Sequence, residues 1–174
     1  AVISVMLIFL IYYLVKLLTE KSFYSFITSF VALSTFMIIK TGNENSWDMY
    51  CYVFAFGAVV FLVSGMKKER MRDFIISGIF LAASVLSKGP VALYGMILSF
   101  FIAYGYVYGI EKYRRNWKGI LITFGTGFVL SCIWPALVLL NYRDIFLGVM
   151  EKEKDTWTSK HTQGILFYLD YFVY

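Results

Sequence analysis

The sequence has little charge, few cysteines and one histidine. Charged residues make up 16% of the 174 residues, whereas a soluble domain carries about a quarter. The two cysteines, Cys51 and Cys132, lie inside apolar runs, without a CxxC pair or a Cys/His cluster. These shortages exclude a disulfide scaffold and a cysteine-based zinc site. The chain is instead rich in apolar residues: it is 60% hydrophobic and 20% aromatic. This composition is typical of a helical membrane protein with aromatic belts.

Several catalytic signatures are also missing from the sequence. There is no P-loop, no GxGxxG after a strand, no serine nucleophile elbow and no HExxH motif. No charged residue lies in the middle of a predicted membrane helix, apart from Asp170 in a partial last segment. Because ion- and proton-coupled transporters usually carry carboxylates inside the membrane, this absence disfavours that class.

Six apolar segments have about the length that a membrane helix needs. They cover residues 1–18, 23–39, 47–66, 74–87, 91–110 and 119–140, and "GILFYLDYFVY" begins a seventh. We therefore predict an all-α polytopic bundle with a transmembrane region at 1–140, an outer polar loop at 141–164 and the start of a further helix at 165–174. Both ends of the chain lie inside apolar or aromatic runs, so we expect a fragment of a larger membrane protein.

The basic residues are distributed unevenly among the predicted loops. Ten of the sixteen follow the first, third and fifth helices, in "LVKLLTEK", "MKKERMRD" and "EKYRRNWK". Six of the eleven acidic residues lie in the other loops. The positive-inside rule therefore places the basic loops in the cytoplasm. It places "KTGNENSWD", "LSKGP" and the long polar stretch outside, where we expect any functional site.

The turn "LSKGP" places Lys88 between two apolar segments. Gly89 suits the end of a helix, and Pro90 suits the first turn of the next one. The N–H groups of Val91, Ala92 and Leu93 would then be free beside the lysine and could bind an anion such as phosphate. The alternative is that Lys88 only offsets the negative end of its own helix and reaches water.

Two further outer segments carry candidate residues. In "NENSWDM" Asp48 falls in the first turn of a helix, which accounts for it structurally; alternatively, Asp48 with Glu44 binds a cation or a sugar hydroxyl. The polar stretch 141–164 begins with a predicted interfacial helix from Arg143 to Leu147. It continues with a charge run that is typical of a solvated face, and His161 has too few companions for a usual zinc site.

Three stretches resemble the membrane glycosyltransferases of the GT-C class. Within that class the closest likeness is to the bacterial branch of the aminoarabinose transferases and protein mannosyltransferases. The stretches are "SWDMYCYVFAFGAVVFLVSG", "FLAASVLSKGPVAL", and "WPALVLL" followed by an acidic loop, a histidine and "FYLDYF". The lysine-glycine-proline turn in the second is the most specific of them.

The resemblance implies transfer of a sugar from a polyprenyl-phosphate carrier to a lipid, glycan or protein acceptor. The reaction would take place at the outer (periplasmic) face of a bacterial inner (plasma) membrane. Lys88, assisted by Arg143, would neutralise the carrier phosphate, and Asp48 would be the catalytic carboxylate near the sugar or acceptor. The outer-loop cavity would include Glu44, Glu151, Glu153 and His161, with His161 as a ligand if a divalent metal is bound.

This sequence departs from the family pattern in two places. The usual base lies in an outer loop before the first helix seen here, and no residue of this chain matches it. An arginine expected between the loop glutamate and the histidine is also missing. Two other functions therefore stay open: a flippase or transporter of an anionic lipid-linked substrate that uses Lys88 in the same way, and a non-catalytic membrane subunit in which Lys88 is replaceable.

Overall fold

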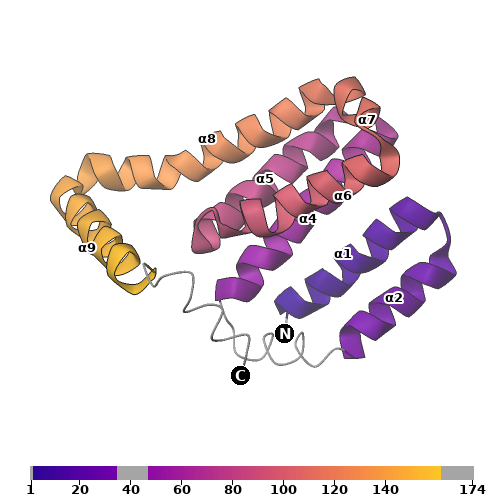
Figure 1. The fold of residues 1–174 in the computed structure, drawn as a ribbon, viewed down its shortest axis with the longest axis horizontal. Helices are drawn as coiled ribbons and strands as arrows, with labels where there is room; N and C mark the ends of the chain where they lie inside the picture. Colours follow the sequence, from indigo (N-terminus) through magenta and orange to yellow (C-terminus); the bar gives the residue numbers. More distant parts are fainter. Residues whose placement is uncertain (1, 35–46, 162–174) are drawn as a thin grey trace. The chain divides into compact units, whose positions relative to one another are not determined.

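A computed structural model describes residues 2–34 and 47–161, with the backbone alone at 47 and 153–161 (Figure 1). The described residues are helical throughout, apart from short turns, and contain no strand. Within the described residues, three helices are long and apolar enough to cross a membrane: Val2–Thr19, Asp48–Lys68 and Trp117–Asn141. The prediction of an all-α membrane bundle is therefore confirmed. The chain divides into two compact units, 1–131 and 132–174, which are described separately below.

The helices follow the predicted apolar segments closely. In chain order they are α1 (Val2–Thr19), α2 (Ser22–Ser34), α4 (Trp47–Lys68), α5 (Met71–Lys88), η1 (Leu93–Leu98), α6 (Ser99–Tyr108), α7 (Glu111–Arg115), α8 (Trp117–Asn141) and α9 (Arg143–His161). The fifth predicted helix begins with a π-helical segment, η1, before it continues as α6. Such segments are rare and are frequently found at functional sites.

The helix α4 lies at the centre of the first unit. Of its most apolar 18-residue stretch, 72% is buried, against 17% for the same stretch of α1. The helix α4 packs on α5, α1 and η1. Its core side chains include Val53, Val60 and Val63, none more than 1% exposed. This burial agrees with the apolar composition of most of the α4 surface.

Small and hydroxyl residues let α5 approach its neighbours closely. Ser77 donates a 2.7 Å hydrogen bond to the carbonyl oxygen of Ala58 in α4. On the other side, Thr123 of α8 donates a 3.0 Å hydrogen bond to the carbonyl oxygen of Phe74, and Gly78 faces the α8 backbone. Membrane helices associate through such close contacts because the lipid provides no hydrophobic driving force between them.

The three basic loops meet at one end of the first unit, which we call the basic end. Lys67, near the end of α4, forms a 2.7 Å ion pair with Glu20 of the α1–α2 turn, and Arg115 of α7 pairs with Glu69 of the α4–α5 turn. The hydrogen bond from Lys67 lowers the pKa of the Glu20 carboxyl below its ordinary value. Because these loops share one end, the structure agrees with the loop grouping inferred from charge.

The polar stretch 141–164 differs from its predicted form. We expected a loop with a short helix from Arg143 to Leu147, but α9 continues for 19 residues to His161. Its first turn is connected directly to α8, since the Phe146 N–H donates to the Tyr142 carbonyl oxygen at 2.9 Å. The predicted seventh segment, 165–174, and Glu44 lie outside the described residues.

Candidate functional site

Asp48 and Lys88 form an ion pair at the end of the first unit opposite the basic end, which we call the turn end. Asp48 lies in the first turn of α4 and Lys88 is the last residue of α5. These helices are antiparallel neighbours, so the start of one lies beside the end of the other. Each charge also has the sign that its own helix end favours. The side chains are 44% and 46% exposed, so a ligand can reach both.

The turn after Lys88 has the predicted glycine geometry. Gly89 has φ = 75°, and its N–H donates a 2.7 Å hydrogen bond to the Val85 carbonyl oxygen, which ends α5. A Cβ at this position would meet nothing within 4 Å. The glycine is therefore required by the positive φ, which other residues adopt only with strain.

The predicted set of free N–H groups after Pro90 needs a correction. The Leu93 N–H donates to the Pro90 carbonyl oxygen at 3.0 Å, so it is already satisfied. The chain forms its first tight turn directly after the proline, and this turn uses that donor. An anion at this turn would therefore depend mainly on the side chain of Lys88 and less on the helix N-terminus.

Small buried residues hold the ion pair in place. Cys51, one turn after Asp48, packs with Ala55 and Ala92, and none of the three is more than 2% exposed. Ser84, one turn before Lys88, donates a 2.8 Å hydrogen bond to the Cys51 carbonyl oxygen. The two charged residues therefore lie directly beside a packed contact of α4, α5 and Ala92, the residue before η1.

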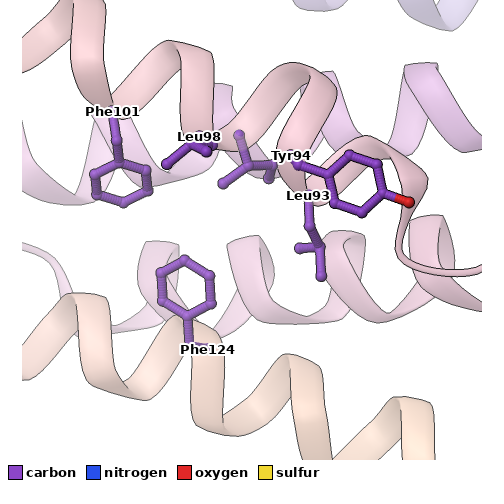
Figure 2. A pocket seen from close by; sticks show the side chains of 6 residues that line it. Leu93, Tyr94, Leu98, Phe101 and Phe124 are labelled. Carbon is purple, nitrogen blue, oxygen red and sulfur yellow. The ribbon is translucent and has the colours of Figure 1, made fainter. Parts of the chain in front are cut away.

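An apolar pocket of about 430 Å³ lies between η1–α6 and α8. Figure 2 shows the side chains of η1 and α6 on one side and Phe124 of α8 on the other. Leu93, at the start of η1, lines the pocket together with Ile97 and Phe101, which follow at helical spacing of four residues. Sequence reasoning missed this pocket because its residues have the same composition as lipid-facing ones.

A buried carboxylate was also missed. Asp73 is 6% exposed and accepts a 2.7 Å hydrogen bond from Ser64 of α4. We had placed it in a basic loop because we expected this helix to begin at Phe74, but α5 begins at Met71. Asp73 lies near the basic end and therefore takes no part in the site around Lys88.

Four other predicted site residues belong to the second unit. Arg143 begins α9, and Glu151 lies eight residues further on, about 12 Å along the helix axis. Both are exposed, and they are not neighbours on the helix. Glu153 and His161 lie in the same helix, at positions where the structure describes the backbone alone. The structure therefore brings together Asp48 and Lys88, and separates Arg143 from Glu151.

Comparison with known families agrees with the sequence pattern. The family model for dolichyl-phosphate-mannose-protein mannosyltransferase matches residues 1–139. The chain belongs to this family. The match covers the ion pair, the glycine-proline turn and the whole of the apolar pocket. Searches of curated proteins and of solved structures gave no match.

Family membership indicates a membrane glycosyltransferase of the GT-C type. The long apolar helices α1, α4 and α8 agree with a multi-pass membrane protein. A divalent metal needs a set of ligands, and among the side chains that the structure describes no three of His, Cys, Asp or Glu lie together.

Proposed function

We propose that this protein transfers a sugar from a polyprenyl-phosphate carrier to a lipid, glycan or protein acceptor, and that Lys88 binds the carrier phosphate. The observation that carries the proposal is the Lys88–Asp48 ion pair at the turn end, in a chain that belongs to a family named for transfer from a lipid phosphate. The site would face the outer side of the membrane, because the basic loops lie at the opposite end.

The ion pair suggests how the carrier would bind. In the sugar-loaded carrier the phosphate is a diester with one negative charge, the same charge as the Asp48 carboxylate, so the two anions can compete for the Lys88 ammonium. The exchange is possible because both side chains are nearly half exposed. When Lys88 turns to the phosphate, a hydroxyl of the sugar or of the acceptor can take the place of the Lys88 ammonium at the Asp48 carboxylate.

The reaction then needs one cation and one carboxylate. The bond between the anomeric carbon and the phosphate oxygen breaks, and the phosphate leaves with the electron pair. Lys88, already in place, stabilises that charge. The acceptor oxygen forms the new bond to the anomeric carbon, and Asp48 accepts the proton that the acceptor hydroxyl loses.

The pocket beside η1 is suited to the isoprenoid chain of the carrier. Its lining residue Leu93 follows Lys88 by five positions, and Ala92 packs against α4 one turn from Asp48. An amphiphile could therefore place its phosphate at Lys88 and its apolar chain between η1–α6 and α8. Aromatic and aliphatic walls without charged side chains agree with such a ligand.

The remaining site residues stay predictions. Arg143 is proposed as a second cation at the phosphate, and Glu44, Glu151 and Glu153 as residues that border the cavity. His161 is proposed as a metal ligand if a divalent ion binds. We assign no step of the reaction to a metal, because the described side chains do not form a ligand set.

Transfer by the full-length protein in membranes tests the proposal. The assay follows radiolabel from a polyprenyl-phosphate sugar into acceptors extracted from the same membranes. Lys88→Ala should lower the rate by about 10- to 100-fold, because it removes a charge-assisted contact to the phosphate. Asp48→Asn should lower it by about 100-fold or more, because it removes the proton acceptor.

Two control variants change the same chemistry at the basic end. Lys67→Ala and Glu20→Gln both break the Lys67–Glu20 ion pair. Each should leave the transfer rate within about twofold of wild type, since exposed pairs add little to stability. If Lys88→Ala and Asp48→Asn behave like these controls, the site assignment is wrong. If wild type moves the labelled carrier across the bilayer without transferring sugar, the protein is a transporter.

A further inference from the structure

A second apolar groove lies between α1 and α2. Figure 1 shows these two helices side by side at one edge of the first unit. Its volume is about 340 Å³, and its walls include Phe9 and Tyr12 of α1 and Phe26 and Phe30 of α2. The two helices run antiparallel and are joined at the basic end by the turn at Glu20. The groove is therefore separate from the pocket between η1–α6 and α8.

One polar group in this groove has no hydrogen-bond partner. Ser29 is 7% exposed, and its hydroxyl makes no hydrogen bond in the structure. Other hydroxyls of the same helix bond to the carbonyl four residues earlier: Ser25 to Lys21 at 3.0 Å and Thr28 to Tyr24 at 2.8 Å. A buried hydroxyl without a partner costs free energy, above all where no water is present. Ser29 therefore points to a ligand that carries a hydrogen-bond acceptor.

The charge around the groove indicates what kind of ligand that is. Lys16 lies one turn beyond Tyr12, and its ammonium is 5.8 Å from the centre of the Tyr12 ring. The loops of the basic end contain ten lysine and arginine residues against four acidic ones. Basic sites between membrane helices on one side attract anionic lipid headgroups. The groove is thus apolar inside and positively charged at one mouth.

We propose that this groove binds one anionic phospholipid from the leaflet at the basic end. The acyl chain lies between Phe9, Phe26 and Phe30, and the headgroup phosphate meets Lys16. Ser29 lies seven residues from the start of α2 at the basic end, about 10 Å along the helix axis. At that depth its hydroxyl donates to an ester carbonyl oxygen of the lipid, because the glycerol esters lie between the phosphate and the chains. This inference does not depend on the proposed glycosyl transfer.

Native mass spectrometry of the full-length protein tests the proposal with two lipids of identical chains. Dioleoyl phosphatidylglycerol should give a one-to-one adduct at lower concentration than dioleoyl phosphatidylcholine. Ser29→Ala should weaken phosphatidylglycerol binding by about 3- to 10-fold, the effect of one neutral hydrogen bond. Lys16→Ala should weaken it by about 5-fold, the effect of one lysine near an anionic surface.

Matched controls exist on the same unit. Thr28→Ala removes a hydroxyl that already has its own bond to Tyr24. Lys118→Ala removes an ammonium that, like that of Lys16, lies over an aromatic ring, 5.9 Å from the centre of the Trp117 ring. This lysine belongs to α8 and does not line the groove. Both should bind phosphatidylglycerol as wild type does. Lys88→Ala should also bind it normally, which separates this site from the carrier site.

A second measurement uses the wild-type protein alone, so it does not depend on whether the variants fold. Phosphatidylglycerol with a photoreactive group on its acyl chain should crosslink to α1 or α2 of the wild-type protein. The proposal is overturned by equal binding of the two lipids, by Ser29→Ala and Lys16→Ala matching their controls, or by crosslinks that fall only on other helices. Crosslinking of another protein segment into this groove would overturn it too.

Discussion

Gly78 provides the sharpest test of how α5 and α8 are held together. A Cβ at this position would lie 2.7 Å from the carbonyl oxygen of Thr123 and 2.7 Å from the Cβ of Thr126. Because one of these atoms belongs to the backbone, the Gly78→Ala variant can only fit if the helices separate. Overpacking of this kind costs about 1–3 kcal/mol, against which the better helix propensity of alanine returns about 1 kcal/mol. We expect a net loss of about 0–2 kcal/mol.

Gly125→Ala is the matched control, since Gly125 also lies inside a helix but the added Cβ would have no heavy atom from outside the local helix backbone within 4 Å. It should keep the propensity gain of about 1 kcal/mol, so the two variants should differ by the overpacking term of about 1–3 kcal/mol. Thermal unfolding of both variants in the same detergent measures this difference. If Gly78→Ala is as stable as Gly125→Ala, the close contact between α5 and α8 is wrong.

The same substitution connects packing with the proposed function. Phe124 of α8 forms one wall of the apolar pocket, and α5 carries Lys88. Separation of the helices should therefore widen the pocket and raise the apparent KM for the polyprenyl-phosphate donor more than it lowers kcat. Gly125→Ala should leave both constants unchanged. An unchanged KM in a destabilised Gly78→Ala variant would argue against this pocket as the site of the carrier chain.

Two further predictions concern the ends of the first unit. Gly89→Ala should lower the free energy of unfolding by about 1 kcal/mol, because alanine is strained at φ = 75°. The control Gly95→Ala in η1 should not lower it, because the added Cβ would have no heavy atom from outside the local helix backbone within 4 Å. Equal melting temperatures of the two variants would contradict the turn geometry. The Glu20 pKa is lowered by Lys67, so the pair should stabilise wild type above the ordinary carboxyl pKa and lose this effect as the pH falls through the lowered value. Between about pH 5 and pH 3, the melting temperature of wild type should therefore fall more steeply than that of Lys67→Ala, and parallel curves would refute the pairing.

The apolar pattern predicted the helices of the first unit well. The segments expected at 47–66 and 74–87 appear as α4 and α5 with ends that differ by at most three residues. Helices in a membrane must be apolar over a set length, so composition alone locates them. The π-helical start of the fifth segment was not predictable, because its sequence "LYGMIL" has no local signal that distinguishes it from an α-helix.

The candidate site was predicted in part. Lys88 and Asp48 were chosen separately, from turn chemistry and from helix capping, and the structure joins them in one ion pair. The free N–H groups expected beside Lys88 were wrong in one case, because the Leu93 N–H is used within the turn. Asp73 was assigned to a loop, because a charged residue at a helix start resembles a loop residue until its burial is known.

By itself, the sequence determined that this is an all-α membrane chain, which loops are basic, and that a lysine-glycine-proline turn separates two helices. These features follow from local composition and from backbone chemistry at single residues. Only the tertiary structure decided that Asp48 meets Lys88, that η1, α6 and α8 line an open apolar pocket, and that the Ser29 hydroxyl lies in a groove without a hydrogen-bond partner. Such contacts join residues on different helices, up to 40 positions apart in the sequence. They depend on which helix faces pack together. An apolar surface of uniform composition does not encode that choice in any short stretch of its sequence.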